Sequence, residues 1–183
     1  NMIVIDNFIK DIMLLEEIQL SKDFFGPNGD FMWWDGWWNS KANTLKKKLI
    51  EYIWCENSPD KSYDISGFEY WTGVYGNDMP NTNLGNHFDK DELHFQNTGE
   101  IVRPVVGTIF YPKDTKFEGG YLEIENEGKT ERIQAKSNRL VIFDAGHDLH
   151  RVTEVTKGTR YAIAINLWLS PPSAVINNSI TLE

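Results

Sequence analysis

The stretch Asn86 to Gln96, NHFDKDELHFQ, contains two of the four histidines of this 183-residue chain. His87 and Asp89 lie two positions apart, and side chains two apart on a strand point to the same side. Two histidines and one carboxylate on one face can hold Fe(II) and leave further positions open. A hydrogen-bonded polar loop is the alternative for this pair. We expect His94 to be a solvent-facing loop residue, with KDELHFQ forming a loop beside the substrate entrance.

The second histidine of such a site has to come from a distant strand. His147 and His150 are three positions apart, so a strand would turn them to opposite sides. His150 shares its side with Val152, whereas His147 lies in the turn DAGHD. The sequence therefore favours His150 as the second metal ligand, and His147 is the alternative if the strand register differs.

Arg160 is predicted to begin the returning strand of a hairpin that turns at Lys157-Gly158. On its side of the strand follow Ala162, Ala164 and Asn166. A buried arginine needs a partner, and small neighbours leave room for a ligand that carries a carboxylate. The alternative is that Arg160 pairs with a core carboxylate such as Asp144.

Short apolar segments separated by turns occupy the chain from Phe68 onward. The segments are FEYWTGVY, VRPVVGTIFY, GGYLEIE, ERIQA, RLVIFD, LHRVTEV and RYAIAINLWL. This spacing indicates an antiparallel sandwich or jelly roll. We predict a mainly β fold with N-terminal helices (α+β), a double-stranded β-helix, in which Gly119-Gly120 has a structural role.

The first 60 residues predict a strand at Met2 to Phe8 and two amphipathic helices, at 9–25 and 40–57. Ile9, Ile12, Leu15 and Ile18 define one face of the first helix, and Ser40 is the expected cap of the second. The run KANTLKKK is expected to be a solvated helix face. We predict one domain over 1–183, with helical support at 1–60, a jelly-roll core at 68–169 and a tail at 170–183.

Four tryptophans lie between positions 33 and 38, in FMWWDGWWN. Packing between the helices and the barrel is the favoured interpretation of this segment. An aromatic wall that contacts a peptide or sugar substrate is the alternative.

The set H-x-D, a distal histidine and an arginine ten residues later resembles the Fe(II)/2-oxoglutarate-dependent dioxygenases, and most closely their prolyl 4-hydroxylase-like branch. The resemblance covers roughly Phe68 to Trp168 and includes IFYPK, FEGGYLEI and NRLVIFDAGHDLHRV. Two positions depart from relatives: Asn166 stands where the oxygen-sensing prolyl hydroxylases carry tryptophan, and Arg160 where the collagen-type enzymes use lysine.

The resemblance implies roles for six residues. His87, Asp89 and His150 would hold the iron. Arg160 and Tyr111 would bind the far carboxylate of 2-oxoglutarate, and Tyr75 would line the same pocket, unless it is an ordinary core aromatic.

The implied reaction is hydroxylation of a peptide residue, a prolyl residue first, or of a small molecule. It would use Fe(II), 2-oxoglutarate and O2, with L-ascorbate as a further reductant, and release succinate and CO2. The alternative is a cupin-like jelly roll that binds a metal or ligand without oxidising anything.

Composition limits the partners and the location. A net charge of −9 argues against a nucleic-acid partner, and so against a nucleic-acid demethylase on this fold. The sequence has no apolar run long enough for a membrane span and no basic, apolar leader at its start. The single cysteine, Cys55, fits a reducing compartment. We therefore expect a soluble cytoplasmic protein, and the sequence does not indicate its oligomeric state.

Overall fold

The computed structural model describes residues 2–26, 31–57, 63–177 and 181–182. Its larger sheet contains β1 (Ile3–Ile5), β2 (Met32–Trp34), β3 (Gly67–Gly76), β5 (Val106–Tyr111), β6 (Phe117–Gly119), β9 (Arg139–Phe143), β11 (Val155–Trp168) and β12 (Thr181–Leu182). The smaller sheet contains β4 (Leu84–His87), β7 (Leu122–Asn126), β8 (Lys129–Ile133) and β10 (Leu149–Val152). The helices are α1 (Ile12–Leu20), α2 (Leu45–Glu51), a π-helical segment (Tyr52–Glu56), α3 (Glu92–Thr98) and α4 (Ser173–Ile176).

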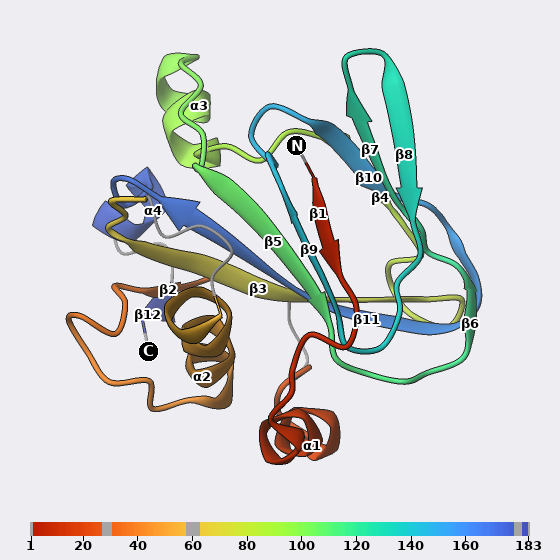
Figure 1. The fold of residues 1–183 in the computed structure, drawn as a ribbon. Helices are drawn as coiled ribbons and strands as arrows, with labels where there is room; N and C mark the ends of the chain where they lie inside the picture. The colour runs from red at the N-terminus through yellow and green to blue at the C-terminus, as the bar shows by residue number, and fades with distance from the viewer. Residues whose placement is uncertain (1, 27–30, 58–62, 178–180, 183) are drawn as a thin grey trace.

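The strand order of the larger sheet is β1-β9-β5-β11-β3-β2-β12, with β6 paired to the start of β11. The smaller sheet has the order β4-β10-β7-β8. Figure 1 shows the smaller sheet beside one face of the larger sheet, with α1 and α2 on the side away from it. This architecture is the double-stranded β-helix with helices that the sequence predicts.

Alternation along β11 separates two apolar cores. Ile163, Ile165 and Leu167 pack with the N-terminal helices, whereas Ala162 packs between the two sheets. Because side chains of a strand alternate in direction, Arg160 and Asn166 lie on the same side as Ala162. β11 therefore separates an apolar support layer from the interior that contains polar groups.

The predicted hairpin at Lys157-Gly158 is wrong. β10 pairs with β4 and β7, and β11 pairs with β3, β5 and β6, so the chain passes from one sheet to the other between them. Gly158 lies inside β11, where its φ is +72° and a Cβ would come within 2.2 Å of the Lys116 carbonyl oxygen. The glycine permits a close crossing with β6 instead of forming a turn.

The first helix is shorter than predicted because Asp11 caps it. The Asp11 carboxylate accepts hydrogen bonds from the backbone N–H groups of Met13 and Leu14, and the helix begins at Ile12. Ile18 is buried as expected, but Ile12 is exposed. Ile9 is buried ahead of the helix, where its backbone N–H and carbonyl both bond to the buried side chain of Asn138.

The second helix begins at Leu45, with Thr44 and not Ser40 as its cap. Ser40 instead accepts a hydrogen bond from the Trp34 indole. The prediction of a fully solvated lysine run is wrong at Lys47, which is buried and donates to Asn43. The aliphatic stem of a lysine can pack in a core when its ammonium finds polar partners.

The tryptophan segment packs mainly into the protein. Trp34 belongs to the core between helices and sheet, Trp37 packs against it, and Trp33 packs against Trp168, while Trp38 is partly exposed. None of the four lines either cavity described below. The packing interpretation is the one the structure supports. Among the described helices, none has the length and apolar composition needed to cross a bilayer.

Candidate metal centre and its cavities

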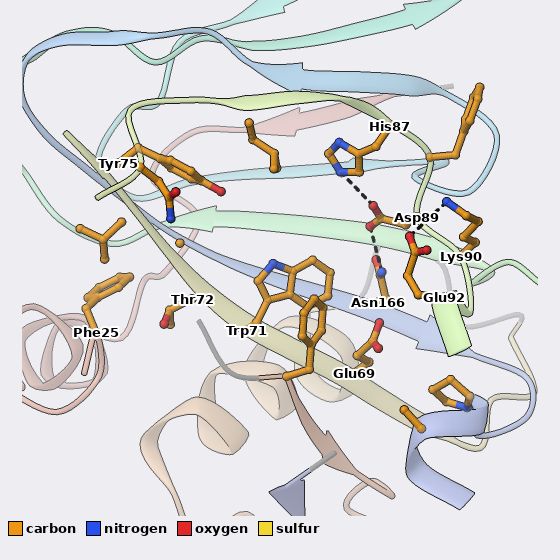
Figure 2. Close-up of a pocket in the computed structure, with 18 of the residues that line it drawn as sticks. Phe25, Glu69, Trp71, Thr72, Tyr75, His87, Asp89, Lys90, Glu92 and Asn166 are labelled. Carbon is orange, nitrogen blue, oxygen red and sulfur yellow. Dashed lines mark hydrogen bonds and ion pairs between the residues drawn. The ribbon is translucent and has the colours of Figure 1, made fainter. Parts of the chain in front are cut away.

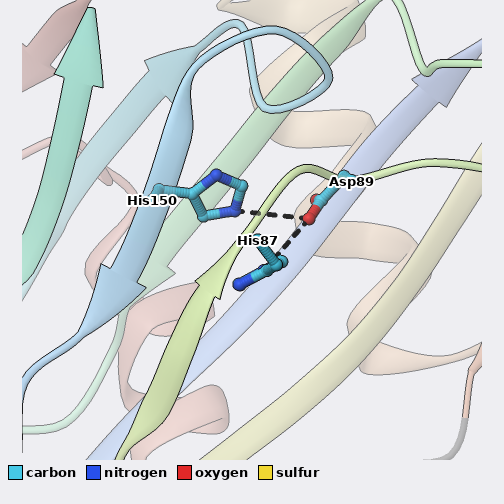
Figure 3. Close-up of side chains that lie close together, drawn as sticks. All are labelled: His87, Asp89 and His150. Carbon is cyan, nitrogen blue, oxygen red and sulfur yellow. Dashed lines mark ion pairs between the residues drawn. The ribbon is translucent and has the colours of Figure 1, made fainter.

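His87, Asp89 and His150 come together where β4 and β10 lie side by side. His150 is the register partner of His87, so the two strands place their rings next to each other, with centroids 4.2 Å apart. Asp89 follows β4, and its backbone N–H donates to the Ala145 carbonyl at 2.8 Å. One ligand atom from each of the three side chains lies within 4.8 Å of the others. Figure 3 shows the three side chains converging on one point.

Both imidazoles are held with Nε2 toward this point. Nδ1 of His87 lies 2.7 Å from the Gly85 carbonyl oxygen, and Nδ1 of His150 lies 2.8 Å from that of Asp148. A carbonyl oxygen only accepts hydrogen bonds, so Nδ1 carries the proton on each ring. The Nε2 atoms, 3.3 Å and 3.2 Å from Asp89 Oδ1, are therefore available as ligands.

The charges at this point favour an ionised carboxylate. Burial acts to raise the pKa of Asp89, but hydrogen bonds with His150 and His87 outweigh it and hold that pKa well below its ordinary value. Burial lowers the pKa of His87, but Asp89 and the Gly85 carbonyl more than compensate, so that pKa is raised. Two imidazole nitrogens and one carboxylate are a donor set that fits Fe(II).

Asn166 is a residue of this centre to which the sequence assigned no role. Its side-chain amide donates to Asp89 Oδ2 at 2.9 Å, while Oδ1 faces the histidines. The amide thus fixes the carboxylate plane. Its position on the Arg160 side of β11 was visible in the sequence, but its contact with a residue 77 positions away was not.

Arg160 is 2% exposed and lies in a narrow cavity that the three candidate ligands also line. Its Nε donates to the Gly120 carbonyl at 2.8 Å, and one terminal nitrogen donates to the Tyr111 hydroxyl at 3.1 Å. The guanidinium also faces the rings of Tyr111 and Tyr75, at 5.0 Å and 5.8 Å from their centroids. No ion pair of Arg160 with a carboxylate is recorded among the described residues.

The alternative partner Asp144 is engaged elsewhere, since it lies 3.0 Å from His147 Nδ1. Burial raises the pKa values of Tyr111 and Tyr75, and the nearby charge of Arg160 partly offsets both shifts. Tyr75 lines the cavity beside Arg160. The arrangement leaves a buried guanidinium, a phenol and small side chains, Ala162 and Ala164, facing a space that reaches the metal centre.

Gly119-Gly120 shapes the Arg160 end of this cavity. Both residues have positive φ, and a Cβ on Gly120 would lie 2.8 Å from Arg160 Cδ. A Cβ on Gly119 would lie 2.0 Å from the Glu154 carbonyl oxygen. The pair is therefore required both by backbone conformation and by close packing.

The two remaining histidines lie outside the centre. His147 is exposed beside Asp144, in the turn where it was predicted. His94 pairs with Glu100 at 3.0 Å. The loop predicted around it is wrong, because Asp91 caps α3 by accepting from the His94 N–H.

A larger cavity of about 1080 Å³ adjoins the narrow one and shares Asp89, His87 and Tyr75 with it. Residues 90–93, at the start of α3, border it, and that they lie beside a substrate entrance stays a prediction. Figure 2 shows Trp71 and Glu69 projecting from β3 toward the space below Asp89, with Tyr75 further along the same strand. Glu69 and Trp71 were not among the residues predicted for the site. Glu69 lies two positions before Trp71, and Trp71 lies four positions before Tyr75. Because even spacings on a strand place side chains on the same side, all three lie on one side of β3.

Comparisons with known proteins give the same picture. The family model described as the 2OG-Fe(II) oxygenase superfamily matches residues 72–169. A PKHD-type hydroxylase of Delftia acidovorans is 34% identical over 79 residues, which cover 43% of this chain and 34% of that relative. The matched segments span about a third of the length of the curated relatives.

Two solved structures illustrate the similarity in fold. A Pseudomonas putida prolyl-4-hydroxylase has a TM-score of 0.61 at 16% identity, and the match covers 93% of this chain and 88% of the other. A prolyl hydroxylase from Trichoplax adhaerens, in complex with a hypoxia inducible factor oxygen degradation domain peptide fragment, has a TM-score of 0.53 at 15% identity. That match covers 95% of this chain and 86% of the other.

Proposed function

Since this chain belongs to the 2OG-Fe(II) oxygenase superfamily, we propose that it is an Fe(II)- and 2-oxoglutarate-dependent dioxygenase that acts as a hydroxylase. Its substrate would be a peptide residue, with a prolyl residue as the first candidate, or a small molecule. The name PKHD-type hydroxylase among relatives and the peptide held by one protein of this fold support hydroxylation and a peptide substrate. The cytoplasmic location and the absence of a nucleic-acid partner stay predictions.

The observation that carries the proposal is the joint position of two sites in one cavity. His87, Asp89 and His150 form the metal-binding donor set, and Arg160 with Tyr111 lies at the other end. When bound, Fe(II) and 2-oxoglutarate activate O2, so that one oxygen atom enters a substrate C–H bond and the other enters succinate, with loss of CO2.

The residues of the chain bind and orient these groups. His87, Asp89 and His150 would hold the iron on one face, and Asn166 would keep the Asp89 carboxylate in its plane. Arg160 would bind the far carboxylate of 2-oxoglutarate by charge-assisted hydrogen bonds, assisted by the Tyr111 hydroxyl. Ala162, Ala164 and Tyr75 line the same cavity, where the two alanines would leave room for the cosubstrate and Tyr75 would lie beside it. L-Ascorbate would serve as a further reductant.

Succinate release tests the proposal. Wild-type protein supplied with Fe(II) and 2-oxoglutarate should release succinate slowly without a substrate, and His87→Ala, Asp89→Ala or His150→Ala should abolish the release. Arg160→Ala should mainly weaken 2-oxoglutarate binding, because the guanidinium is lost while the metal donors stay. His94→Ala is the control, since His94 pairs with Glu100 outside the centre and its loss should leave release unchanged.

The cupin-like alternative predicts a different result. A jelly roll that only binds metal needs no carboxylate site beside it, so 2-oxoglutarate should not stabilise the metal-loaded protein against heat. An oxygenase should show that stabilisation, and Arg160→Ala should remove it. A wild-type protein that binds neither iron nor 2-oxoglutarate would refute the enzyme proposal.

A further inference from the structure

Among the described residues, four acidic side chains line the larger cavity, and they differ in their partners. Glu92 pairs with Lys90 at 3.1 Å. Asp91 accepts backbone hydrogen bonds from His94 and Ser173, at 3.0 Å and 2.7 Å. Asp89 faces two histidines and Asn166. Glu69 is the fourth, and its hydrogen bonds come from the neutral side chains of Trp168 and Asn166.

Glu69 lies inside the protein at the metal end of the cavity, with an exposed fraction of 9%. Its Oε1 accepts a long hydrogen bond from the Trp168 indole nitrogen, at 3.4 Å, and the neutral Asn166 side chain also forms a hydrogen bond with this carboxyl group. Among the residues that the structure describes, no lysine, arginine or histidine forms an ion pair with it or lowers its pKa. A buried carboxylate without a counter-charge is unfavourable, so a positively charged group beside Glu69 would stabilise the ionised carboxylate.

The electrostatics of Glu69 agree with this geometry. Burial, with smaller contributions from the charges of Asp89 and Asp91, raises its pKa to about 7 against the opposing effect of the hydrogen bonds from Trp168 and Asn166. A positively charged ligand beside Glu69 would reverse that shift. Ligand binding and ionisation of this carboxyl would then support each other.

An aromatic wall stands next to the carboxyl. Trp71 is two residues along β3 from Glu69 and so lies on the same side of the strand. Phe31 packs against Trp71 with ring centroids 4.7 Å apart, and both rings line the cavity. An indole face beside a carboxylate suits an ammonium or guanidinium group with an apolar stem, through cation–π contact and stem packing.

Glu69 is separate from the arginine that would bind the cosubstrate. In the pairing of β11 with β3, Arg160 lies opposite Tyr75 and Asn166 lies opposite Glu69, so the two pairs are six residues apart on each strand. Six residues of extended strand span about 20 Å. The cavity system therefore has a cationic group at the Arg160 end and an anionic group near the metal centre, where Asn166, the register partner of Glu69, donates to Asp89.

We propose that the substrate presents a positively charged group, an ammonium or guanidinium on an apolar stem, to Glu69 and Trp71. This inference rests on the proposed hydroxylase function and narrows its substrate class. A prolyl residue alone carries no such charge, so the substrate would bear the cation on the hydroxylated residue itself or on a neighbour. Glu69 would determine specificity by pairing with the cation.

Matched pairs of ligands test the proposal. The probes are arginine against its neutral isostere citrulline, and lysine against norleucine, each as the free residue blocked by N-acetylation and C-amidation and within a short, similarly blocked peptide that also contains proline, so that the side chain carries the only positive charge. Binding is measured by calorimetry on the protein with Fe(II) and 2-oxoglutarate under anaerobic conditions. The free and peptide forms distinguish a small-molecule source of the cation from a peptide source.

The charged member of a pair should bind wild-type protein about 10-fold or more tightly than the neutral member, the range expected of a charge-assisted hydrogen bond. Glu69→Gln should bring the two members of the pair close to equal affinity. Glu92→Gln is the matched control, because it removes the same charge at the rim of the same cavity from a carboxylate that already has a lysine partner. It should retain the preference.

Equal binding of charged and neutral members, a preference that survives Glu69→Gln, or one that Glu92→Gln removes equally well would overturn the inference. Failure of every arginine and lysine probe to bind would do the same. Substrate-free succinate release by the wild type, measured on the same preparation, reports on the hydroxylase function independently. Release without a cation preference would refute only the inference, and no release would refute the function on which it rests.

Discussion

Asn166 holds the Asp89 carboxylate by a single hydrogen bond to Oδ2, on the side away from the histidines. Asn166→Ala should leave the three donor side chains present but free the carboxylate to rotate. Partners of metal ligands typically contribute about 10- to 100-fold in metal affinity, and we expect a loss in that range. Titration with Mn(II) or Fe(II) measures this loss of metal affinity.

Asn39→Ala, which removes an exposed amide bonded to the Asp35 carbonyl, is the control and should bind metal as the wild type does. Unchanged affinity in Asn166→Ala would show that the carboxylate is fixed by other contacts.

Glu69 predicts a pH dependence of stability in the metal-free protein. Its folded pKa of about 7 lies above the ordinary value of 4.5. Between those pH values the unfolded chain has lost the proton and the folded protein keeps it. Stability therefore falls as pH rises through this window, by about 3 kcal/mol at most.

Glu69→Gln has no carboxyl to ionise, so its free energy of unfolding should not show this loss. Urea denaturation at pH 5 and pH 8 gives the comparison, and the advantage of the wild type over Glu69→Gln should shrink as pH rises. If the two proteins changed in parallel between these pH values, the Glu69 pKa would be close to normal.

The strand elements explain why some of these residues were predictable. The H-x-D spacing and the alternation along β11 are local, so they correctly indicated that the side chains of His87 and Asp89 lie close together and that Arg160, Ala162 and Asn166 share a side. The contacts of Asn166 with Asp89 and of Trp168 with Glu69 join residues 77 and 99 positions apart. They depend on which strands pair, and no local pattern specifies that.

Gly120, directly after β6, constrains the position of Arg160. Its φ is +65°, and a Cβ added to it would lie 2.8 Å from Arg160 Cδ. The position therefore has no room for a side chain. Gly120→Ala should displace the guanidinium and reduce 2-oxoglutarate affinity by about 10-fold or more, the effect of losing one good charged hydrogen bond. Metal affinity should stay near that of the wild type.

Gly128→Ala is the matched control for Gly120→Ala. Gly128 also has a positive φ, +76°, but nothing lies within 4 Å of an added Cβ. Gly128→Ala should therefore lower the free energy of unfolding by about 1 kcal/mol or slightly more because of backbone strain, as urea denaturation would measure. Its 2-oxoglutarate affinity should not change. Equal 2-oxoglutarate affinity in both variants and the wild type would mean that Arg160 is not held by the Gly120 turn.

At the scale of the whole molecule, the sequence predicted the fold class but not the path of the chain. Repeated short apolar segments indicated a jelly roll, which the two sheets confirm. The hairpin predicted between β10 and β11 does not exist, because the chain changes sheets there and Gly158 serves a close crossing with β6. The dipeptide Lys157-Gly158 is compatible both with a hairpin turn and with a close approach of two strands. Which of the two occurs depends on how distant strands pair, and the local sequence does not specify that.

The larger cavity likewise belongs to the whole molecule. Phe31 and Trp71 form its aromatic wall from β3 and the residue before β2, whereas the conspicuous tryptophans at 33–38 pack mostly into the core. Aromatic composition alone could not tell a wall from a core, since both bury large rings. The distinction required the position of each ring relative to both sheets.

The fate of oxygen tests the central claim most directly. Protein supplied with Fe(II), 2-oxoglutarate and isotopically heavy O2 should release succinate that carries one heavy oxygen atom, detected by mass spectrometry. His150→Ala and a sample without iron should release none. Unlabelled succinate, or labelled succinate that persists in His150→Ala, would contradict the assignment of His87, Asp89 and His150 as the iron site of a 2-oxoglutarate-dependent dioxygenase.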